Sequence, residues 1–295
     1  MSGGPRVVVA TSALGLERDT DMPLLIAALR ERGVDAVAAR WDDGGTDWAQ
    51  SAAVVVRSTW DYTERLPEFL KWADDVAAAT RLDNPAPLVR WNTDKRYLAE
   101  LGARGVPVVP TRFVAPGEDP VLPERGEFVV KPTVSVAARD SARYGQDHRD
   151  AAVRHIAALH AAGATAMVQP YLSRIDEGER ALAFIGGTFS HALRKGPVLT
   201  DIAVVDNARV PHPDLVPHEP SDAELAVAAA ALAAAAAITD PPAGDLLYAR
   251  VDVALADDGS PVLMELELVE PHLFLELADG AAGRFADAVV ARVLS

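Results

Sequence analysis

The chain has 295 residues, 49% of them hydrophobic, with a formal net charge of −15 and no cysteine. This length and apolar content allow one large or two to three small globular units with sizeable cores. The negative charge works against non-specific binding to nucleic acid or anionic membranes, and the missing cysteine excludes disulfides, thiolate zinc sites and cysteine nucleophiles.

The first ninety residues alternate strand and helix patterns, which predicts a parallel α/β sheet. Strands are expected at 6–10, 34–41 and 52–57, with a helix at 21–32 ended by Gly33. The segment Arg-Ser-Thr-Trp-Asp-Tyr at 57–62 follows a strand end, where ligands of such sheets bind, and its side chains suit a small zwitterion. The alternative is a capped helix start with Trp60 packed under it.

A linker rich in breakers, residues 82–87, marks the end of this first unit. The pattern beyond it is α+β, because helical and extended segments follow without regular alternation. Helices are expected at 94–102 and 147–162, extended segments at 106–109, 112–114, 128–131 and 166–170, and a strand pair around 183–189 that turns at Gly186-Gly187.

Lysine is rare in this chain, with four lysines against 24 arginines. Lys131 ends an apolar strand and precedes a loop of small residues, so its ammonium projects from apolar surface as a phosphate-binding lysine would. The alternative is that Lys131 occupies this position by chance and does not bind phosphate. The P-loop, Gly-x-Gly-x-x-Gly and kinase motifs are absent, which argues against those nucleotide sites.

The alanine-rich run 223–237 comes closest to a membrane span. Alanine is only weakly apolar, and Ser221 with Glu224 forms a capping box, so we predict a helix of a soluble protein that ends at residues 240–244. With no signal peptide in the sequence, we expect a cytoplasmic protein.

In the stretch 248–270, apolar and polar residues alternate on both sides of Asp258-Gly259. This pattern predicts a β-hairpin with these two residues as its loop. Val251, Val253, Leu266 and Leu268 then face a core. The facing pairs are Asp257 with Ser260, Asp252 with Glu265 and Arg250 with Glu267.

Three carboxylates of this hairpin, Asp252, Glu265 and Glu267, share its other face. Cross-strand neighbours lie about 5 Å apart, so these groups repel unless a cation lies between them. Oxygen ligands favour a hard ion, and magnesium is usually held by one or two carboxylates plus substrate phosphates. The alternative is a solvated acidic hairpin in an acidic protein.

The order of these landmarks resembles the ATP-grasp ligases over essentially the whole chain. The resemblance implies an α/β plus α+β architecture: an ATP-grasp fold with an N-terminal parallel-sheet (pre-ATP-grasp) domain. The expected units are an N-terminal substrate-side domain (1–90), a central lid subdomain (91–168) and a C-terminal subdomain with the metal site (169–295). The matching segments are 91–95, 129–132, 169–172, 250–252 and 265–267.

Within the family the pattern resembles most closely the D-cycloserine synthetase type, a cyclo-ligase that closes O-ureido-D-serine. The segments that suggest this are 57–62, 178–180, 189–192 with Lys195, and 265–271. Two departures from the family pattern are visible. Glu267 stands where the family commonly has asparagine, and the phosphate-covering loop 133–140 has no glycine, so we expect a stiffer or more open lid.

The resemblance also implies residue roles. ATP phosphates are expected at Lys95, Lys131 and the loop residue Ser135, and magnesium at Asp252, Glu265 and Glu267. Arg250 and Lys195 are the expected catalytic residues, with Arg250 steadying the γ-phosphate and an acyl phosphate. The adenine is expected at Gln169, Tyr171 and Leu172, the ribose at Glu177 with Asp176 behind it, and the substrate at Arg57, Thr59, Trp60, Asp61, Glu270 and His272.

The function implied is an ATP- and magnesium-dependent ligase that activates an amino-acid-like carboxylate for attack by nitrogen of the same molecule. Two alternatives stay open: a glutathione-synthetase-like ligase that joins two substrates, and a nucleotide-binding regulator without turnover. The expected partner is a small molecule, without nucleic acid or membrane, and a homodimer is left open.

Overall fold

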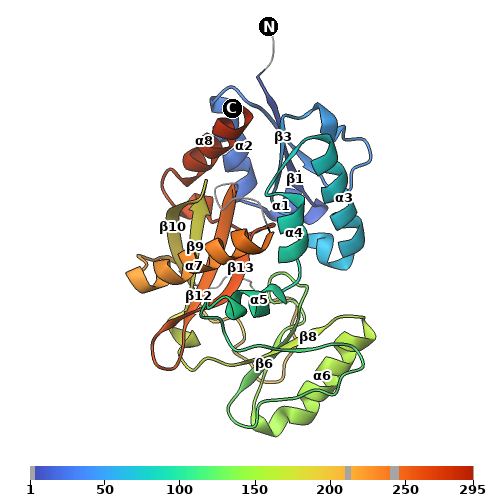
Figure 1. The fold of residues 1–295 in the computed structure, drawn as a ribbon, viewed down its shortest axis with the longest axis vertical. Coiled ribbons are helices and arrows are strands. Elements are labelled where there is room, and N and C mark those ends of the chain that lie inside the picture. Colours follow the sequence, from blue (N-terminus) through green and yellow to red (C-terminus); the bar gives the residue numbers. More distant parts are fainter. Residues whose placement is uncertain (1–3, 210–213, 240–245, 295) are drawn as a thin grey trace.

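The computed structural model describes residues 4–209, 214–239 and 246–294, and it contains three sheets. Figure 1 shows them stacked along the long axis of the molecule, from the N-terminal sheet at one end to the sheet covered by α6 at the other. The mixture of a parallel N-terminal sheet with two antiparallel sheets is the α/β plus α+β architecture expected from the sequence.

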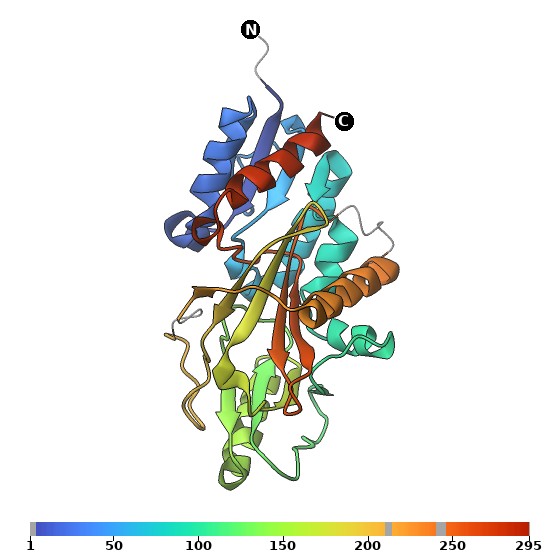
Figure 2. The same cartoon turned by 90° about the vertical axis from the view of Figure 1, so that its left-hand side faces the viewer.

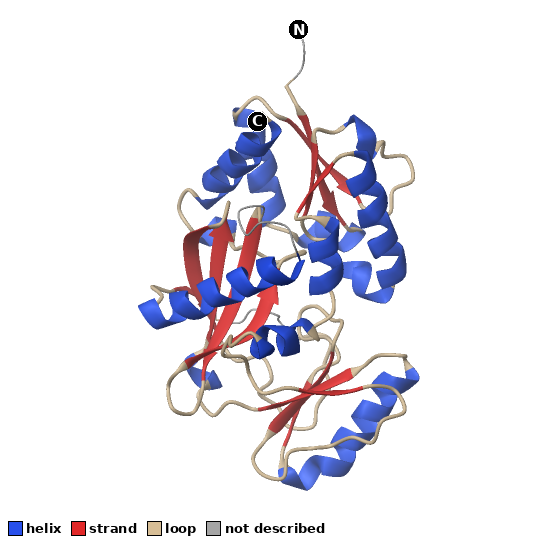
Figure 3. Cartoon of the chain, in the orientation of Figure 1, coloured by secondary structure: helices blue, strands red, loops and turns tan. Residues whose placement is uncertain are grey.

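The N-terminal sheet is parallel throughout, in the order β2-β1-β3-β4. Alternate side chains of β1 enter separate cores, as the two-residue period of a strand requires. Val7 and Val9 pack with α2 and α8, whereas Val8 packs with α3 and α4. Helices therefore cover both faces (Figure 3). The strands are β1 (Arg6–Thr11), β2 (Asp35–Arg40), β3 (Ala53–Val56) and β4 (Arg81–Asp83), and the helices are α1 (Ala13–Arg18), α2 (Asp21–Glu31), α3 (Leu66–Ala79), α4 (Ala86–Asn92) and α8 (Ala281–Val293).

The segment expected to be a linker, residues 82–87, is instead structured. Its first residues belong to β4, because Leu82 is buried beside β3, and Pro85 precedes the first turn of α4. The C-terminal helix α8 returns to the N-terminal sheet, where Phe285 and Val289 pack against Leu25 of α2. Figure 2 shows this return: the red α8 lies beside the blue N-terminal segment.

The central sheet is antiparallel, in the order β5-β8-β6-β7, with α6 on one face. Phe128 and Val130 of β6 pack with Ile156 of α6 in one core. The alternation of the strand therefore directs Val129 and Lys131 to the opposite face. The elements are β5 (Arg112–Val114), β6 (Phe128–Pro132), β7 (Ala142–Tyr144), β8 (Ala166–Pro170), α5 (Tyr97–Ala103), α6 (Arg149–Ala161) and the short helix η3 (Gln146–His148). The short helices η1 (Trp48–Gln50) and η2 (Trp60–Glu64) belong to the N-terminal unit, where they pack with α3.

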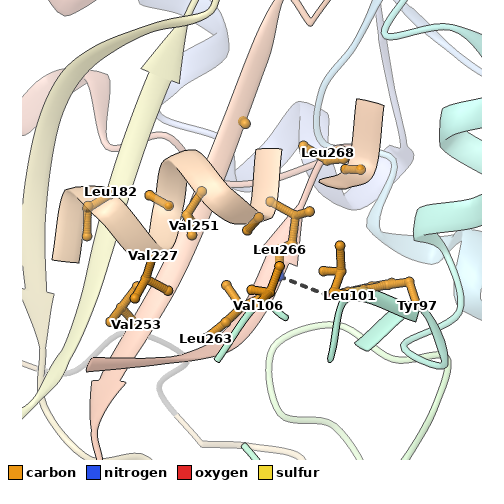
Figure 4. Packing of buried hydrophobic residues seen from close by; sticks show 14 of the residues in the cluster. Tyr97, Leu101, Val106, Leu182, Val227, Val251, Val253, Leu263, Leu266 and Leu268 are labelled. Atoms are coloured by element: carbon orange, nitrogen blue, oxygen red, sulfur yellow. Dashed lines mark hydrogen bonds between the residues drawn. The ribbon is translucent and has the colours of Figure 1, made fainter. Parts of the chain in front are cut away.

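The C-terminal sheet, in the order β11-β10-β9-β12-β13, carries α7 on one face. Val227 of α7 packs with Val251, Val253 and Leu266 (Figure 4). The predicted capping box is present, since Ser221 N–H donates to Glu224 Oε2 at 2.8 Å, whereas the predicted helix end at 240–244 lies outside the described residues. The elements are β9 (Glu179–Ile185), β10 (Thr188–Lys195), β11 (Val216–Pro217), α7 (Asp222–Thr239), β12 (Tyr248–Leu255), β13 (Pro261–Glu267), η4 (Ile175–Glu177) and η6 (Leu275–Leu277).

Among the described residues, α7 is the one helix long and apolar enough to cross a membrane by length and composition. Its alanines 228, 231 and 235 are fully buried against the C-terminal sheet. One face of this helix is therefore packed in the core of that sheet.

The outer edge of β13 is closed by side chains from the segment before the central sheet. Asn92 donates to the carbonyl of Leu266 at 2.8 Å and accepts from the N–H of Leu268 at 2.7 Å. Tyr97 Oη accepts from the N–H of Leu266 at 2.9 Å, the bond drawn in Figure 4. An open strand edge is a site for unwanted pairing, and these bonds both cover it and fix the strand in place.

Candidate active site

The acidic hairpin forms with two of the three facing pairs expected from the sequence, whereas Ser260 faces Ala256 and not Asp257. Arg250 lies opposite Glu267, and Asp252 lies opposite Glu265. The predicted two-residue loop was wrong, because Ala256 N–H bonds to Ser260 O at 2.8 Å, which leaves three residues in the loop. A β-bulge between the Asp252 and Val253 pairings absorbs the extra residue and restores the register beyond it.

The face of the C-terminal sheet opposite α7 carries a buried network of charges. Arg250 makes two hydrogen bonds to Asp252, both 2.9 Å, and also pairs with Glu267. Lys195 Nζ lies 2.7 Å from Asp252 Oδ2 and pairs with Glu179. The intervening residues of β9 are Ala181 and Ala183, whose small side chains leave room for the long cationic side chains to lie across that strand.

Lysines from the neighbouring segments complete this network. Lys95, just before α5, places Nζ 3.0 Å from Glu265 Oε1 and donates to Ser135 O at 2.7 Å. Lys131 of β6 lies close enough to repel Lys95 and attract Glu265. Within the described residues it has no hydrogen bond or ion pair of its own, in contrast to Lys95 and Lys195. Lys131 is therefore the cation of this site that stays open to an anionic ligand.

Burial and charge together shift the pKa values of these groups. Burial raises the pKa of Glu267 to about 7 although Arg250 opposes this shift, and burial with the nearby Glu267 raises the pKa of Glu270 to about 8. Burial also opposes ionisation of Asp252, but Arg250 and Lys195 outweigh it and lower its pKa well below the usual range. Burial lowers the pKa of Lys131. Additional positive charge at this face would therefore favour the ionised carboxylates.

The donors fit a hard divalent ion. They are carboxylate oxygens, and Glu265 and Glu267 keep 25% and 26% of their side chains exposed, so the site is accessible. In this conformation each carboxylate is engaged by a lysine or arginine. Among the described residues, one group of three has ligand atoms within 4.8 Å of one another, and it is Asp19, Asp21 and His272 rather than the hairpin acids.

The residues expected around the adenine follow β8. Gln169 is buried and donates to Thr111 Oγ1 at 2.8 Å. Arg143 stacks on Tyr171, with its guanidinium carbon 3.7 Å from the ring centroid, and Leu172 precedes η4. Glu177 is half exposed and held by Arg174, at 2.5 and 3.0 Å, on the surface.

The phosphate-covering loop takes an unusual backbone. Ala137, Ala138 and Asp140 have φ values of 53°, 55° and 53°, the left-handed region that non-glycine residues rarely occupy. Asn207 holds the loop through two hydrogen bonds to Asp140, at 2.8 and 2.9 Å.

The residues expected to bind substrate lie where the N-terminal sheet meets the segment after β13. Arg57 is fully buried and donates to the carbonyl of Pro271 at 2.8 Å, and Trp60 Nε1 donates to the carbonyl of Glu270 at 3.2 Å. Asp61 accepts from Trp41 Nε1 at 2.8 Å, away from that segment. Thr59 is fully buried.

His272 connects this region to the charged network. Its Nε2 lies 3.2 Å from Thr20 Oγ1, and its carbonyl accepts from Arg250 at 2.9 Å. Burial lowers its pKa to about 4, so the imidazole is neutral at physiological pH.

Three acids of these regions were missed from the sequence. Glu179 pairs with Lys195 on the functional face, and Asp19 and Asp21 are buried beside His272. The strand alternation from Arg180 onward could have indicated that Glu179 shares the face of Lys195. Asp19 and Asp21 carried no signal beyond their place at the start of a helix.

Comparison with known proteins first defines the class. The chain superposes on a RimK domain ATP-grasp protein of Sphaerobacter thermophilus with a TM-score of 0.65 at 19% identity, over 97% of this chain and 99% of that one. It superposes on D-alanine–D-alanine ligase of Bacillus anthracis with a TM-score of 0.66 at 14% identity, over 99% and 98% of the chains. The fold is that of the ATP-grasp ligases.

Closer relatives define the family. Residues 7–84 match the family model of the D-cycloserine synthetase DcsG N-terminal domain. The cycloserine biosynthesis protein DcsG of Streptomyces lavendulae is 43% identical, over 97% of this chain and 98% of that protein. A crystal structure of D-cycloserine synthetase DcsG superposes with a TM-score of 0.88 at 40% identity, over 98% and 99% of the chains. The chain belongs to the DcsG family, and it is an ATP-dependent ligase.

Proposed function

We propose that this enzyme uses ATP and magnesium to close O-ureido-D-serine to D-cycloserine, as part of antibiotic biosynthesis. The observation that carries the proposal is the open cation Lys131 near the Glu265 and Asp252 carboxylates, with expected substrate residues where the N-terminal sheet meets residues 270–272. The names of the relatives with 43% and 40% identity support the same reaction.

ATP binds between the central and C-terminal sheets. Lys95 and Lys131 contact its phosphates, and the backbone around Ser135 covers them; Lys95 already bonds to Ser135 O. Gln169, Tyr171 and Leu172 frame the adenine. Either Glu177 or the partly buried Glu179 binds the ribose, and the ion pair of Glu179 with Lys195 in the charged network favours Glu179.

Asp252, Glu265 and Glu267 hold magnesium, which supplies charge neutralisation for the phosphates during transfer. The raised pKa of Glu267, caused first by burial, supports this assignment, because an added cation would stabilise its ionised form. Glu267 brings one more negative charge than the asparagine common in the fold family. We expect this charge to strengthen the metal site.

The reaction needs no side-chain nucleophile. A carboxylate oxygen of the substrate attacks the γ-phosphorus of ATP, and ADP leaves. Arg250 and Lys195 offer fixed positive charge to the transferring phosphoryl group and the acyl phosphate, and their ion pairs to Asp252 hold them in place. The nitrogen bonded to the ureido oxygen of the same molecule then attacks the acyl carbon, and phosphate leaves as the ring closes. Hydrolysis of the carbamoyl group on that nitrogen by water releases it as carbon dioxide and ammonia and leaves D-cycloserine.

Ring closure within one molecule benefits from proximity, since the nitrogen is already tethered near the acyl carbon. Arg57, Thr59, Trp60, Asp61, Glu270 and His272 are the proposed substrate-side residues. The segment 269–272 joins the two halves of the site, because the carbonyls of Glu270, Pro271 and His272 accept bonds from Trp60, Arg57 and Arg250.

The test is ADP release from magnesium-ATP with O-ureido-D-serine alone, followed by mass spectrometry of the product. We expect ADP release with the single substrate and a product with the mass of D-cycloserine. ADP release that requires a second amino acid, with a joined product, would instead establish a two-substrate ligase. Nucleotide binding without ADP release for any amino acid would establish a regulator.

The division into functional units is part of the proposal. The units are the substrate-side domain (1–90), the lid (91–168) and the metal-bearing subdomain (169–295), with α8 completing the first unit from the far end of the chain. We propose that the enzyme acts in the cytoplasm on a small molecule, without nucleic acid or membrane.

A further inference from the structure

A second cluster of polar groups lies at the start of α2, where the N-terminal sheet meets residues 271–276. Asp19 and Asp21 are 6% and 0% exposed, and one ligand atom of each lies within 4.8 Å of the other and of one from His272. Thr20, between the two acids, donates to Glu276 Oε1 at 2.8 Å. None of the roles described above uses Asp19 or Asp21.

The oxygens of Asp21 are occupied by the protein itself. Oδ1 accepts from Leu275 N–H at 2.6 Å, and Oδ2 accepts from Leu273 N–H at 2.7 Å and lies 3.4 Å from Arg57. Asp21 therefore fastens the segment 271–276 to the N-terminal sheet. Its charge has a structural role and little capacity for a ligand.

Asp19 is different, because one of its oxygens is left over. Oδ1 accepts from the N–H groups of Asp21 and Met22, at 2.9 and 3.2 Å, and so caps α2. Oδ2 is buried and has no hydrogen-bond partner among the described residues. An unpartnered buried carboxylate oxygen is costly, so this atom indicates a donor that the ligand supplies.

A second group with unpartnered polar atoms, Arg57, lies beside Asp21 in the same cluster. Arg57 is 1% exposed, and its Nη2 reaches Asp21, while Nε and Nη1 have no hydrogen-bond partner in the described part of the chain. Its guanidinium lies over the rings of Tyr248 and Phe285, at 5.4 and 5.6 Å, which fixes its orientation. Arg57 and Asp19 are both neighbours of Asp21, and the unpartnered donors of the one and the unpartnered oxygen of the other suit a ligand with both a cationic and an oxygen-bearing end.

This arrangement favours an ammonium group over a metal ion. A divalent ion needs several open ligand oxygens, and Asp19 Oδ2 is the one left unpartnered by the two carboxylates. The guanidinium of Arg57 beside Asp21 also repels a divalent charge. An ammonium needs one strong acceptor and brings a single charge.

The cluster is also adjacent to the phosphoryl-transfer residues. His272 approaches Asp21 with its side chain, at 4.0 Å, and bonds to Arg250 through its carbonyl, at 2.9 Å. A substrate whose ammonium lies at Asp19 can therefore extend past His272 toward Arg250, where the proposed acyl transfer takes place.

We propose that Asp19 binds the α-ammonium group of the amino-acid substrate and thereby selects amino acids over the corresponding hydroxy acids. The inference rests on the proposed function for the identity of the substrate. Because Oδ2 is shielded, substrate entry requires the segment 271–276 to move away from α2, and the ammonium then pairs with Asp19 as the segment closes.

The experiment is calorimetric titration of the full chain with O-ureido-D-serine and with the analogue in which a hydroxyl replaces the α-ammonium. A hydrogen bond between charged groups implies that the wild type prefers the amino compound by about 10- to 100-fold. Asp19→Asn removes the charge and keeps an oxygen for capping α2. We expect it to reduce that preference to within about threefold, by weakening only the amino compound, and to leave the KM for ATP unchanged.

Two further variants keep the test decisive. Asp19→Ser also retains a capping oxygen and should lose the preference, even if Asp19→Asn folds poorly. Glu17→Gln removes an exposed charge two residues away and should behave as the wild type.

Equal binding of the two compounds by the wild type, absence of binding, or an intact preference in both Asp19 variants would overturn the inference. If the preference for the amino compound depends on Asp19 but no turnover is observed, the proposed function is refuted and the ammonium site at Asp19 is supported. If turnover is observed but the preference does not depend on Asp19, the proposed function is supported and the ammonium site is refuted.

Discussion

Asn92 offers a sharp test of how β13, the strand of the proposed metal ligands Glu265 and Glu267, is held. Its side chain bonds to both Leu266 O and Leu268 N, the peptide groups that flank Glu267. Asn92→Ala leaves both buried groups without a partner, at about 1–3 kcal/mol each, so we expect a loss of about 2–6 kcal/mol in the free energy of unfolding. At roughly 2–4 °C per kcal/mol, Tm should fall by at least about 4 °C.

The same change should reduce turnover in the fraction that stays folded, because Glu265 and Glu267 lose the side chain that fixes their strand. Asn92→Asp is the informative partner: it still accepts from Leu268 but can no longer donate to Leu266, so it should lie between wild type and Asn92→Ala in Tm. The assays are thermal unfolding and ADP release at 25 °C. Gln50→Ala, at an exposed residue bonded to Asp47, should change neither. Wild-type Tm and turnover in Asn92→Ala would refute the reasoning.

Three further changes test separate parts of the site. Lys195→Met removes the cation between Asp252 and Glu179 and should lower kcat about 100-fold or more with little change in the KM for ATP; an unchanged kcat would contradict its catalytic role. Burial, then Glu267, raises the pKa of Glu270 to about 8, so the folded protein holds a proton that the unfolded chain releases near pH 4.5, and stability falls as pH rises between these values. Glu270→Gln should therefore raise the Tm of the metal-free protein more at pH 9 than at pH 5, and equal shifts would refute the assignment. Tyr171→Ala removes the ring stacked under Arg143 and should weaken nucleotide binding about 5- to 10-fold by calorimetry, whereas unchanged affinity would place the adenine elsewhere.

The spacing of apolar residues predicted helices and strands correctly where one face of the element is buried. The parallel N-terminal strands, α7 with its capping box, and the pairing of Arg250 with Glu267 and of Asp252 with Glu265 are confirmed. The faces of the two hairpin strands were predicted correctly although the predicted loop length was wrong. Its alternation fixes which residues face the core, and the β-bulge restored the side-chain faces that the three-residue loop would have exchanged.

The parts that the sequence could not predict depend on contacts between distant segments. Nothing local to β4 indicates a strand, since it forms by pairing with β3. In the sequence, Asp19 and Asp21 are ordinary acidic residues at the start of a helix. Their surroundings form only when residues 271–276 fold against them. Lys131 was singled out by the rarity of lysine, and Lys95 and Lys195 by the family resemblance. The carboxylates that pair with Lys95 and Lys195 come from other strands.

The central claim is that the hairpin acids hold magnesium for a bound triphosphate. Its most direct test is calorimetric titration with a non-hydrolysable ATP analogue, with and without magnesium, on the wild type and on the double variant Glu265→Gln with Glu267→Gln. Asp258→Asn, at the exposed turn of the same hairpin, is the matched control. We predict that magnesium strengthens analogue binding in the wild type and the control and has no effect in the double variant. An equal effect of magnesium in all three would contradict the account.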